Sequence, residues 1–210
     1  MSNIIDFLQS EEGHKIIEGV SKETNQPADK TAQVLTMGMP ILMAAMGRNV
    51  KKETNSGLMG ALENKHDGSI LDNLGSLFQG GVSKDVKLDG LGILGHVLGG
   101  SQNNVARALS AKTGMDVSSV MQILQIAAPI LLGFLGKEKK QKNIDSQEGL
   151  EGLLGGLIGN ATGATDGQSL FESILDGDGD GSVIDDVAGM VLGNKKKGGL
   201  GGMLGGMFGK

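Results

Sequence analysis

The chain has 210 residues, of which 39% are hydrophobic, enough for one large domain or two small ones around a buried core. A formal net charge of -5 and the lack of Trp and Tyr argue against a nucleic-acid-binding protein, which needs clustered cations and, for single strands, stacking rings. Cysteine is absent, so thiol catalysis, thiolate metal sites and disulfides are excluded. With 37 Gly and 11 Met against five Phe, we expect a core of aliphatic side chains packed closely over glycine.

The N-terminal sequence shows neither the basic start nor the long apolar stretch of a signal peptide. The longest apolar runs, Met37 to Met46 and Ile123 to Leu135, are shorter than the roughly 20 residues of a membrane-spanning helix. We interpret both runs as buried core helices and expect a cytoplasmic protein.

Apolar residues recur at helical spacing along the chain. The pattern predicts helices around residues 4–8 and 16–20 before the first apolar run, and around 94–98 and 105–109 before the second. Pro40 and Pro129 lie inside the two long helices, where proline removes a backbone donor and favours a kink. No strand pattern stands out, so the predicted fold class is all-α, a compact multi-helix bundle.

An internal duplication organises the chain. A shift of 89 positions aligns eight identical residues between positions 21 and 47, including Pro40-Ile41-Leu42 with Pro129-Ile130-Leu131. Later segments match at longer offsets, which places the added residues in loops. We therefore divide the chain into a first helical repeat (1–88), a second helical repeat (89–194) and a flexible, glycine-rich tail (195–210).

A basic stretch is predicted to follow each long helix, at residues 48–52 and 137–140. Cations at this point face the negative pole of the helix dipole, an interpretation that we favour over a phosphate-binding patch.

An Asp-rich segment, residues 176–186, resembles the start of an EF-hand or dockerin calcium loop. Carboxylates and one backbone carbonyl take the first ligand positions and two further acids follow: Asp176, Asp178, Asp180, Ser182, Asp185 and Asp186. The acid expected at the last ligand position is replaced by Val187. The segment is a candidate structural Ca²⁺ site, and the alternative is a metal-dependent enzyme that uses the same acids.

Part of this motif has a simpler explanation. Ser182 with Asp185, and Ser69 with Asp72 in the first copy, fit a capping box at a helix start. The first copy carries Lys65 at a ligand position, so calcium binding is predicted for the second copy alone.

The C-terminal tail shows apolar residues at helical spacing, with glycine at most other positions: Leu200, Met203, Leu204, Met207 and Phe208. Glycine disfavours a helix by about 1 kcal/mol per residue relative to alanine, so we expect the tail to be disordered alone and to fold on contact. Residues 198–210 are a candidate contact for an unknown protein partner or for self-association. A low-complexity end without a role, and a membrane surface bound with the help of Lys195 to Lys197, remain open alternatives.

The three histidines, His14, His66 and His96, show no metal-ligand spacing and are expected to be surface or capping residues. A His/Asp proton relay beside the Asp-Gly turns, at His66-Asp67 or at His96, is a less favoured alternative. No phosphate loop and no nucleophile elbow is present in the sequence.

Three segments, Asp89 to Gly99, Ser110 to Gly114 and Ala127 to Gly133, together with residues 178–186, resemble the bacterial YidB-like family, domain of unknown function 937. The resemblance covers most of the chain and implies an all-helical bacterial protein. It implies no established activity and no catalytic residues. We therefore expect a non-enzymatic interaction or assembly module, with Ca²⁺ as its one candidate cofactor.

Overall fold

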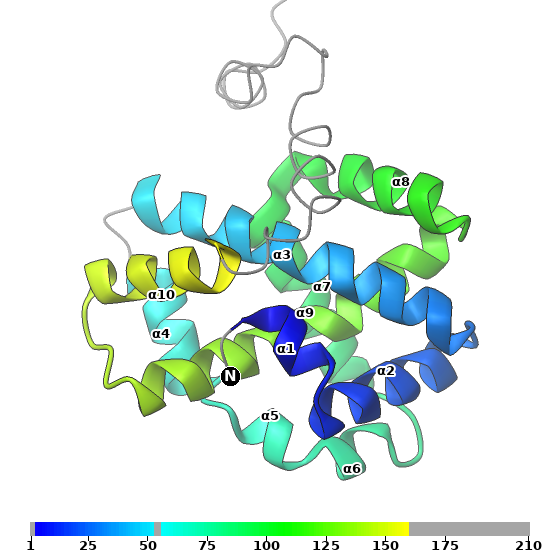
Figure 1. Ribbon diagram of the computed structural model, residues 1–210, viewed down its shortest axis with the longest axis horizontal. Helices are drawn as coiled ribbons and strands as arrows, with labels where there is room; N and C mark the ends of the chain where they lie inside the picture. Colours follow the sequence, from blue (N-terminus) through cyan, green and yellow to red (C-terminus); the bar gives the residue numbers. More distant parts are fainter. Residues whose placement is uncertain (1–2, 53–55, 160–210) are drawn as a thin grey trace, which may run out of the picture. The chain divides into compact units, whose positions relative to one another are not determined.

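A computed structural model describes residues 3–52 and 56–159, which form α-helices and one 3-10 helix (Figure 1). These residues contain no strand, so the predicted all-α fold class is confirmed. The Asp-rich segment 176–186 and the tail 195–210 lie outside the described residues. In chain order the elements are α1 (Ile4–Leu8), α2 (Glu11–Thr24), α3 (Ala28–Lys52), α4 (Ser56–Asn64), α5 (Ser69–Asp72), α6 (Leu74–Phe78), α7 (Lys84–Leu98), η1 (Gly99–Ser101), α8 (Gln102–Thr113), α9 (Val117–Gln141) and α10 (Gln147–Gly159).

Polar side chains at the starts of α1, α2, α7 and α9 accept hydrogen bonds from free backbone N–H groups there. Asn3 accepts a hydrogen bond from the Asp6 N–H at 2.8 Å and caps α1. Asp116 caps α9 by accepting from the Ser119 N–H at 2.9 Å. Hydrogen bonds from Ser118 and Ser119 hold the pKa of Asp116 well below its usual range. The starts of these helices are therefore fixed by short-range signals in the sequence.

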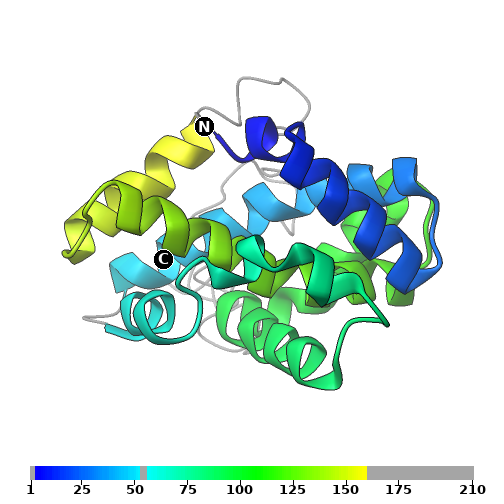
Figure 2. The same cartoon turned by 90° about the horizontal axis from the view of Figure 1, so that it is seen from below.

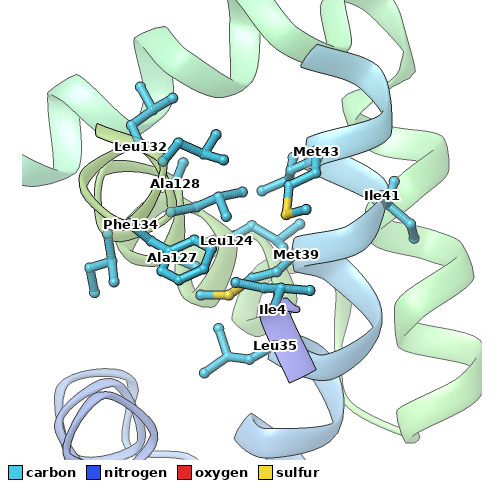
Figure 3. Close-up of a cluster of buried hydrophobic side chains, with 14 of the residues drawn as sticks. Ile4, Leu35, Met39, Ile41, Met43, Leu124, Ala127, Ala128, Leu132 and Phe134 are labelled. Carbon is cyan, nitrogen blue, oxygen red and sulfur yellow. The ribbon is translucent and has the colours of Figure 1, made fainter. Parts of the chain in front are cut away.

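The two long helices, α3 and α9, pack against each other and form most of the core. Figure 3 shows Met39 and Met43 of α3 directed toward Leu124 and Ala128 of α9, and all four are fully buried. Burial of each large apolar side chain contributes about 2 kcal/mol. Since α9 also contacts α2, α4, α5, α7 and α8, it is the central helix of the described residues.

Among the described residues, α9 is the one helix that is long and apolar enough to cross a membrane, with a mean hydropathy of 1.7 over its most apolar window. In the structure 72% of that window is buried. On α1, Phe7 adds to this burial by packing against Phe134 of α9, with ring centroids 4.6 Å apart. The apolar run is thus a core helix, as predicted.

The pairs α2–α3 and α8–α9 show the same local geometry at positions 89 apart. The Thr24 hydroxyl donates to the Val20 carbonyl at 2.7 Å, and the Thr113 hydroxyl donates to the Leu109 carbonyl at 2.8 Å. Helices α3 and α9 also begin and end 89 positions apart. These matches agree with the predicted duplication, which stays an interpretation of the sequence, as does a kink at either proline. The boundary predicted at 88/89 falls inside α7, and one hydrophobic core joins the two halves.

Both long helices end later than predicted. The basic stretches 48–52 and 137–140 do not follow α3 and α9 but form their last turns. Lysine is a good helix former, and ion pairs hold the end of α9: Lys139 pairs with Glu63 at 3.0 Å and Lys140 with Asp67 at 2.8 Å. The cations of α9 still lie at the negative pole of its dipole, in its last turn.

Glycine lets two backbone segments lie directly against α9. A β-carbon on Gly90 would stand 1.7 Å from the Gln125 carbonyl oxygen, and one on Gly136 would stand 1.9 Å from the His66 carbonyl oxygen. Atoms in a packed protein do not approach so closely, so a side chain at either position requires the backbone to move. Gly92, on the outer side of α7, has no atom within 4 Å of the same point. Packing within the described residues therefore requires glycine at position 90 but not at position 92.

Replacing Gly90 with alanine is expected to lower the free energy of unfolding by about 2–3 kcal/mol, because the new β-carbon overlaps the Gln125 carbonyl. The matched control on the same helix, Gly92→Ala, is expected to raise it by up to about 1 kcal/mol, since alanine favours a helix. Urea unfolding of both variants measures the difference. Equal stabilities would show that α7 does not rest on α9 in this way.

Candidate binding groove between α4 and α7

A cavity of about 650 Å³ opens between α4 and α7 and is completed by residues of α3 and α9. Figure 2 shows α7 at the periphery of the helices. Most of the cavity wall is apolar and includes Met46, Val50, Leu58, Ile93, Val97 and Leu132. We call this cavity and its rim the α4–α7 groove. Its volume and its mostly apolar wall are those of ordinary ligand-binding sites in proteins.

Three polar side chains meet in the wall of the groove. Lys65 forms a short ion pair with Asp89, and the Nε2 atom of His66 lies 3.5 Å from the Oδ2 atom of Asp89. Burial lowers the pKa of His66, whose exposed fraction is 6%; the Asp89 carboxylate opposes this effect and the Lys65 ammonium adds to it. The imidazole is therefore neutral at pH 7. It offers one donor and one acceptor beside an apolar cavity, while the charges of Lys65 and Asp89 compensate each other.

Main-chain contacts hold His66 in this position. Helix α4 ends at Asn64, and the His66 N–H donates to the Ala61 carbonyl at 2.8 Å. The His66 carbonyl lies against Gly136 of α9. The turn after α4 is thus pressed onto the central helix, which buries the imidazole.

The start of α7 is anchored to α2. Glu23 accepts one hydrogen bond from the Lys87 ammonium at 2.6 Å and another from the Val82 N–H at 2.9 Å. Burial raises the pKa of Glu23, but these hydrogen bonds outweigh it, so its pKa lies below the ordinary value. Ser83 then caps α7 by accepting from the Val86 N–H at 3.3 Å. One wall of the groove is therefore fixed at the N-terminal end of α7.

The structure corrects two predictions near His66. His14 and His96 are exposed, as predicted, but His66 is buried, and its carboxylate neighbour is Asp89 rather than Asp67. The less favoured alternative, a relay between His66 and the adjacent Asp67, is therefore not formed. The reason is that Asp67 is already engaged by Lys140, which together with Ser69 holds the pKa of Asp67 well below its usual range.

The predicted capping box of Ser69 and Asp72 is also wrong. Helix α5 begins at Ser69, and its N-cap residue, Gly68, makes no side-chain capping bond. Instead, the Asp67 carboxylate accepts from the Ser69 N–H at 3.1 Å. Gly68 has a φ of 104°, which brings the chain close to Lys137 of α9 and fixes where α5 starts.

The candidate metal ligands Asp176, Asp178, Asp180, Ser182, Asp185 and Asp186 all lie outside the described residues. Within residues 3–52 and 56–159, no group of three acids or histidines could hold a metal ion.

Sequence reasoning missed the groove itself. The cluster of Lys65, His66 and Asp89 joins residues that are 23 and 24 positions apart, and no local pattern indicates that pairing. One feature of the sequence could have indicated the groove. Helix α7 carries apolar residues on its outer side, the exposed Leu88 and Leu91, as well as on its inner side. A helix that is apolar on two sides indicates a second contact.

The fold and the groove define an all-α protein with an open, mostly apolar surface site. The chain belongs to the family described as bacterial protein of unknown function (DUF937), whose model matches residues 6–138 and 147–210. No match was found among curated proteins, and none among solved structures.

The burial of His66 predicts a pH dependence of stability. Its folded-state pKa is below the unfolded value, so the unfolded chain takes up the proton first as the pH falls. The contribution of His66 is complete above about pH 6.5, the unfolded pKa, and is lost as the pH falls from there toward the folded pKa. We expect the urea midpoint to fall between about pH 7.5 and pH 5.5, above the range where carboxylates titrate.

His66→Gln is expected to remove most of this slope, whereas His14→Gln, at an exposed position, is expected to keep it. A midpoint that does not change with pH in the wild-type chain, or an unchanged slope in His66→Gln, would contradict the assignment.

Proposed function

We propose that the chain is a non-enzymatic helical interaction module that binds a protein partner at the α4–α7 groove. The observation that carries the proposal is the exposure of Leu88 (65%), which lines the apolar cavity, and of Leu91 (45%) on the outer side of the same helix. Large apolar side chains held in water beside a concave apolar wall are typical of surfaces that receive a partner helix.

The polar cluster supports binding of an apolar segment. Asp89 is paired with Lys65, and His66 is neutral, so a partner that covers the cluster leaves no unpaired charge behind. The imidazole supplies one hydrogen bond that orients the bound segment. These groups thus define a direction for the partner while the surrounding apolar wall supplies the affinity.

Site-specific photocrosslinking in the source cells tests the proposal. With benzoylphenylalanine in place of Leu91 on α7, irradiation is expected to give a covalent adduct with a protein, identified by mass spectrometry. The same group in place of Glu18, an exposed residue of α2, is the control and is expected to give no adduct of that size. Equal adduct patterns at the two positions, or no protein adduct at position 91, would refute a protein contact at the groove.

Two further proposals rest on the sequence beyond the groove. We propose that residues 176–186 hold a structural Ca²⁺, supported by three Asp residues at alternate positions; the alternative is a metal-dependent enzyme that uses these acids. Millimolar calcium should then raise the melting temperature of the wild-type chain but not that of Asp176→Asn/Asp178→Asn.

We also propose residues 198–210 as a second contact, for a partner or for another copy, because of their apolar spacing. Flotation with liposomes, which compares the full chain with one ending at Asn194, separates this role from membrane binding.

A further inference from the structure

The outer side of α7 has an unusual composition for a helix face in water. Leu88 and Leu91 are exposed there, and Gly92 and Gly95 lie on the same side one turn further along. The inner side of the helix is already used, because Gly90 rests against α9. The outer side therefore carries apolar surface that no described residue covers.

The two outer glycines have no packing explanation within the described residues. A β-carbon on Gly92 would meet no atom within 4 Å, and one on Gly95 would meet only the Gln102 side-chain nitrogen at 3.8 Å. Glycine within a helix costs about 1 kcal/mol relative to alanine, so each position weakens α7 with no compensating contact among the described residues. A close approach by another molecule explains both, since a helix surface without β-carbons admits a neighbouring side chain.

The outer face of α7 is complementary to the same face of a second copy that runs in the opposite direction. Leu88 and Gly92 lie four residues apart around residue 90, so an antiparallel second copy centred there places each Leu88 over the Gly92 of the other copy. Gly92 lines the cavity, which leaves room for the leucine. Leu88 is thus a protruding side chain and Gly92 a gap on the same helix face. A two-fold axis places the leucine of each copy in the gap of the other, so the contact forms twice.

The polar residues at the ends of the face agree with the same centre. Asp85 and His96 are exposed, line the groove and are eleven residues apart, so they lie on one edge of α7 about three turns from each other. Their midpoint falls between residues 90 and 91. In the antiparallel pair each Asp85 carboxylate faces the His96 imidazole of the other copy and accepts a hydrogen bond from it. A parallel pair would place Asp85 against Asp85.

We propose that the partner received at the α4–α7 groove is a second copy of this chain, with the two α7 helices antiparallel about a two-fold axis near residue 90. The inference rests on the proposed function and names its partner. A second copy is favoured over an unrelated protein because the face is complementary to itself. In a two-fold dimer the contact of Leu88 with Gly92 and the contact of Asp85 with His96 each form twice.

Disulfide trapping tests this geometry, and the absence of native cysteine makes single-cysteine variants unambiguous. Leu91 lies next to the predicted axis, so Leu91→Cys in the full chain is expected to form a disulfide-linked dimer on mild oxidation. Glu18→Cys, on the exposed side of α2, is the control and should stay monomeric under the same conditions. A monomeric Leu91→Cys protein, or equal dimer formation by both variants, would overturn the geometry.

Charge reversal tests the reciprocal contact. Sedimentation equilibrium should give a dimer for the wild-type chain and a dissociation constant at least about 100-fold higher for Leu88→Asp, which places a carboxylate over the glycine of the other copy. Asp85→Lys and His96→Glu alone should each raise the dissociation constant about tenfold, and the double variant Asp85→Lys/His96→Glu should restore it. These positions are exposed, so we expect the variants to stay folded, and circular dichroism of each variant is the control.

Two results would refute the second copy as partner. One is a double variant that does not restore the dimer, and the other is a wild-type chain that is monomeric at 100 µM, on the order of a weak dimer's dissociation constant. If position 91 still crosslinks to a different protein, the proposed function stands while this inference fails. If neither dimer nor protein adduct is found, both fail.

Discussion

The carbonyl oxygen of Gln125 lies 1.7 Å from the point where a β-carbon on residue 90 would stand, so α7 rests on α9 only because residue 90 is glycine. The same constraint applies where the His66 carbonyl meets Gly136. A side chain at either position would push one backbone segment away from the central helix. These two contacts set where α7 and the turn after α4 lie on α9, and together with the Glu23 anchor at the start of α7 they position the walls of the α4–α7 groove.

One consequence concerns the polar cluster. The turn after α4 lies against α9, which buries the His66 imidazole and brings it within 3.5 Å of the Asp89 carboxylate on α7. The pairing of Asp89 with Lys65 then ties the end of α4 to α7 across the groove. Close packing through glycine thus positions the polar residues, and they in turn fix the spacing of the two helices.

A second consequence concerns the outer face of α7. The inner side of this helix is taken up by Gly90 and the fully buried Leu94. Leu88 and Leu91 point away from that side and remain in water. A helix with both sides apolar needs a second surface to cover the outer one, which is the basis of the proposed interaction.

The helices themselves could be predicted from the sequence because their apolar spacing is a local property. The 3.6-residue pattern around Ile16 and Val105 indicates α2 and α8 directly, and burial of both residues follows. The ends of α3 and α9 were predicted too early, since basic residues are also good helix formers. No local sequence pattern indicates the burial of His66 or its contact with Asp89. Both depend on the packing of the turn after α4 against Gly136 of α9, which is distant in the sequence.

Nuclear magnetic resonance titration of the His66 imidazole in Gly136→Ala tests the dependence of the site on the glycine contact most directly. In the wild-type chain the pKa of the His66 imidazole should lie below the ordinary value of about 6.5, because the side chain is buried. In a folded Gly136→Ala chain the turn moves off α9, water reaches the imidazole, and the pKa should rise toward the ordinary value. Gly75→Ala, where a β-carbon meets no atom within 4 Å, should leave it unchanged. A His66 pKa that is the same in folded Gly136→Ala as in the wild-type chain would contradict the account.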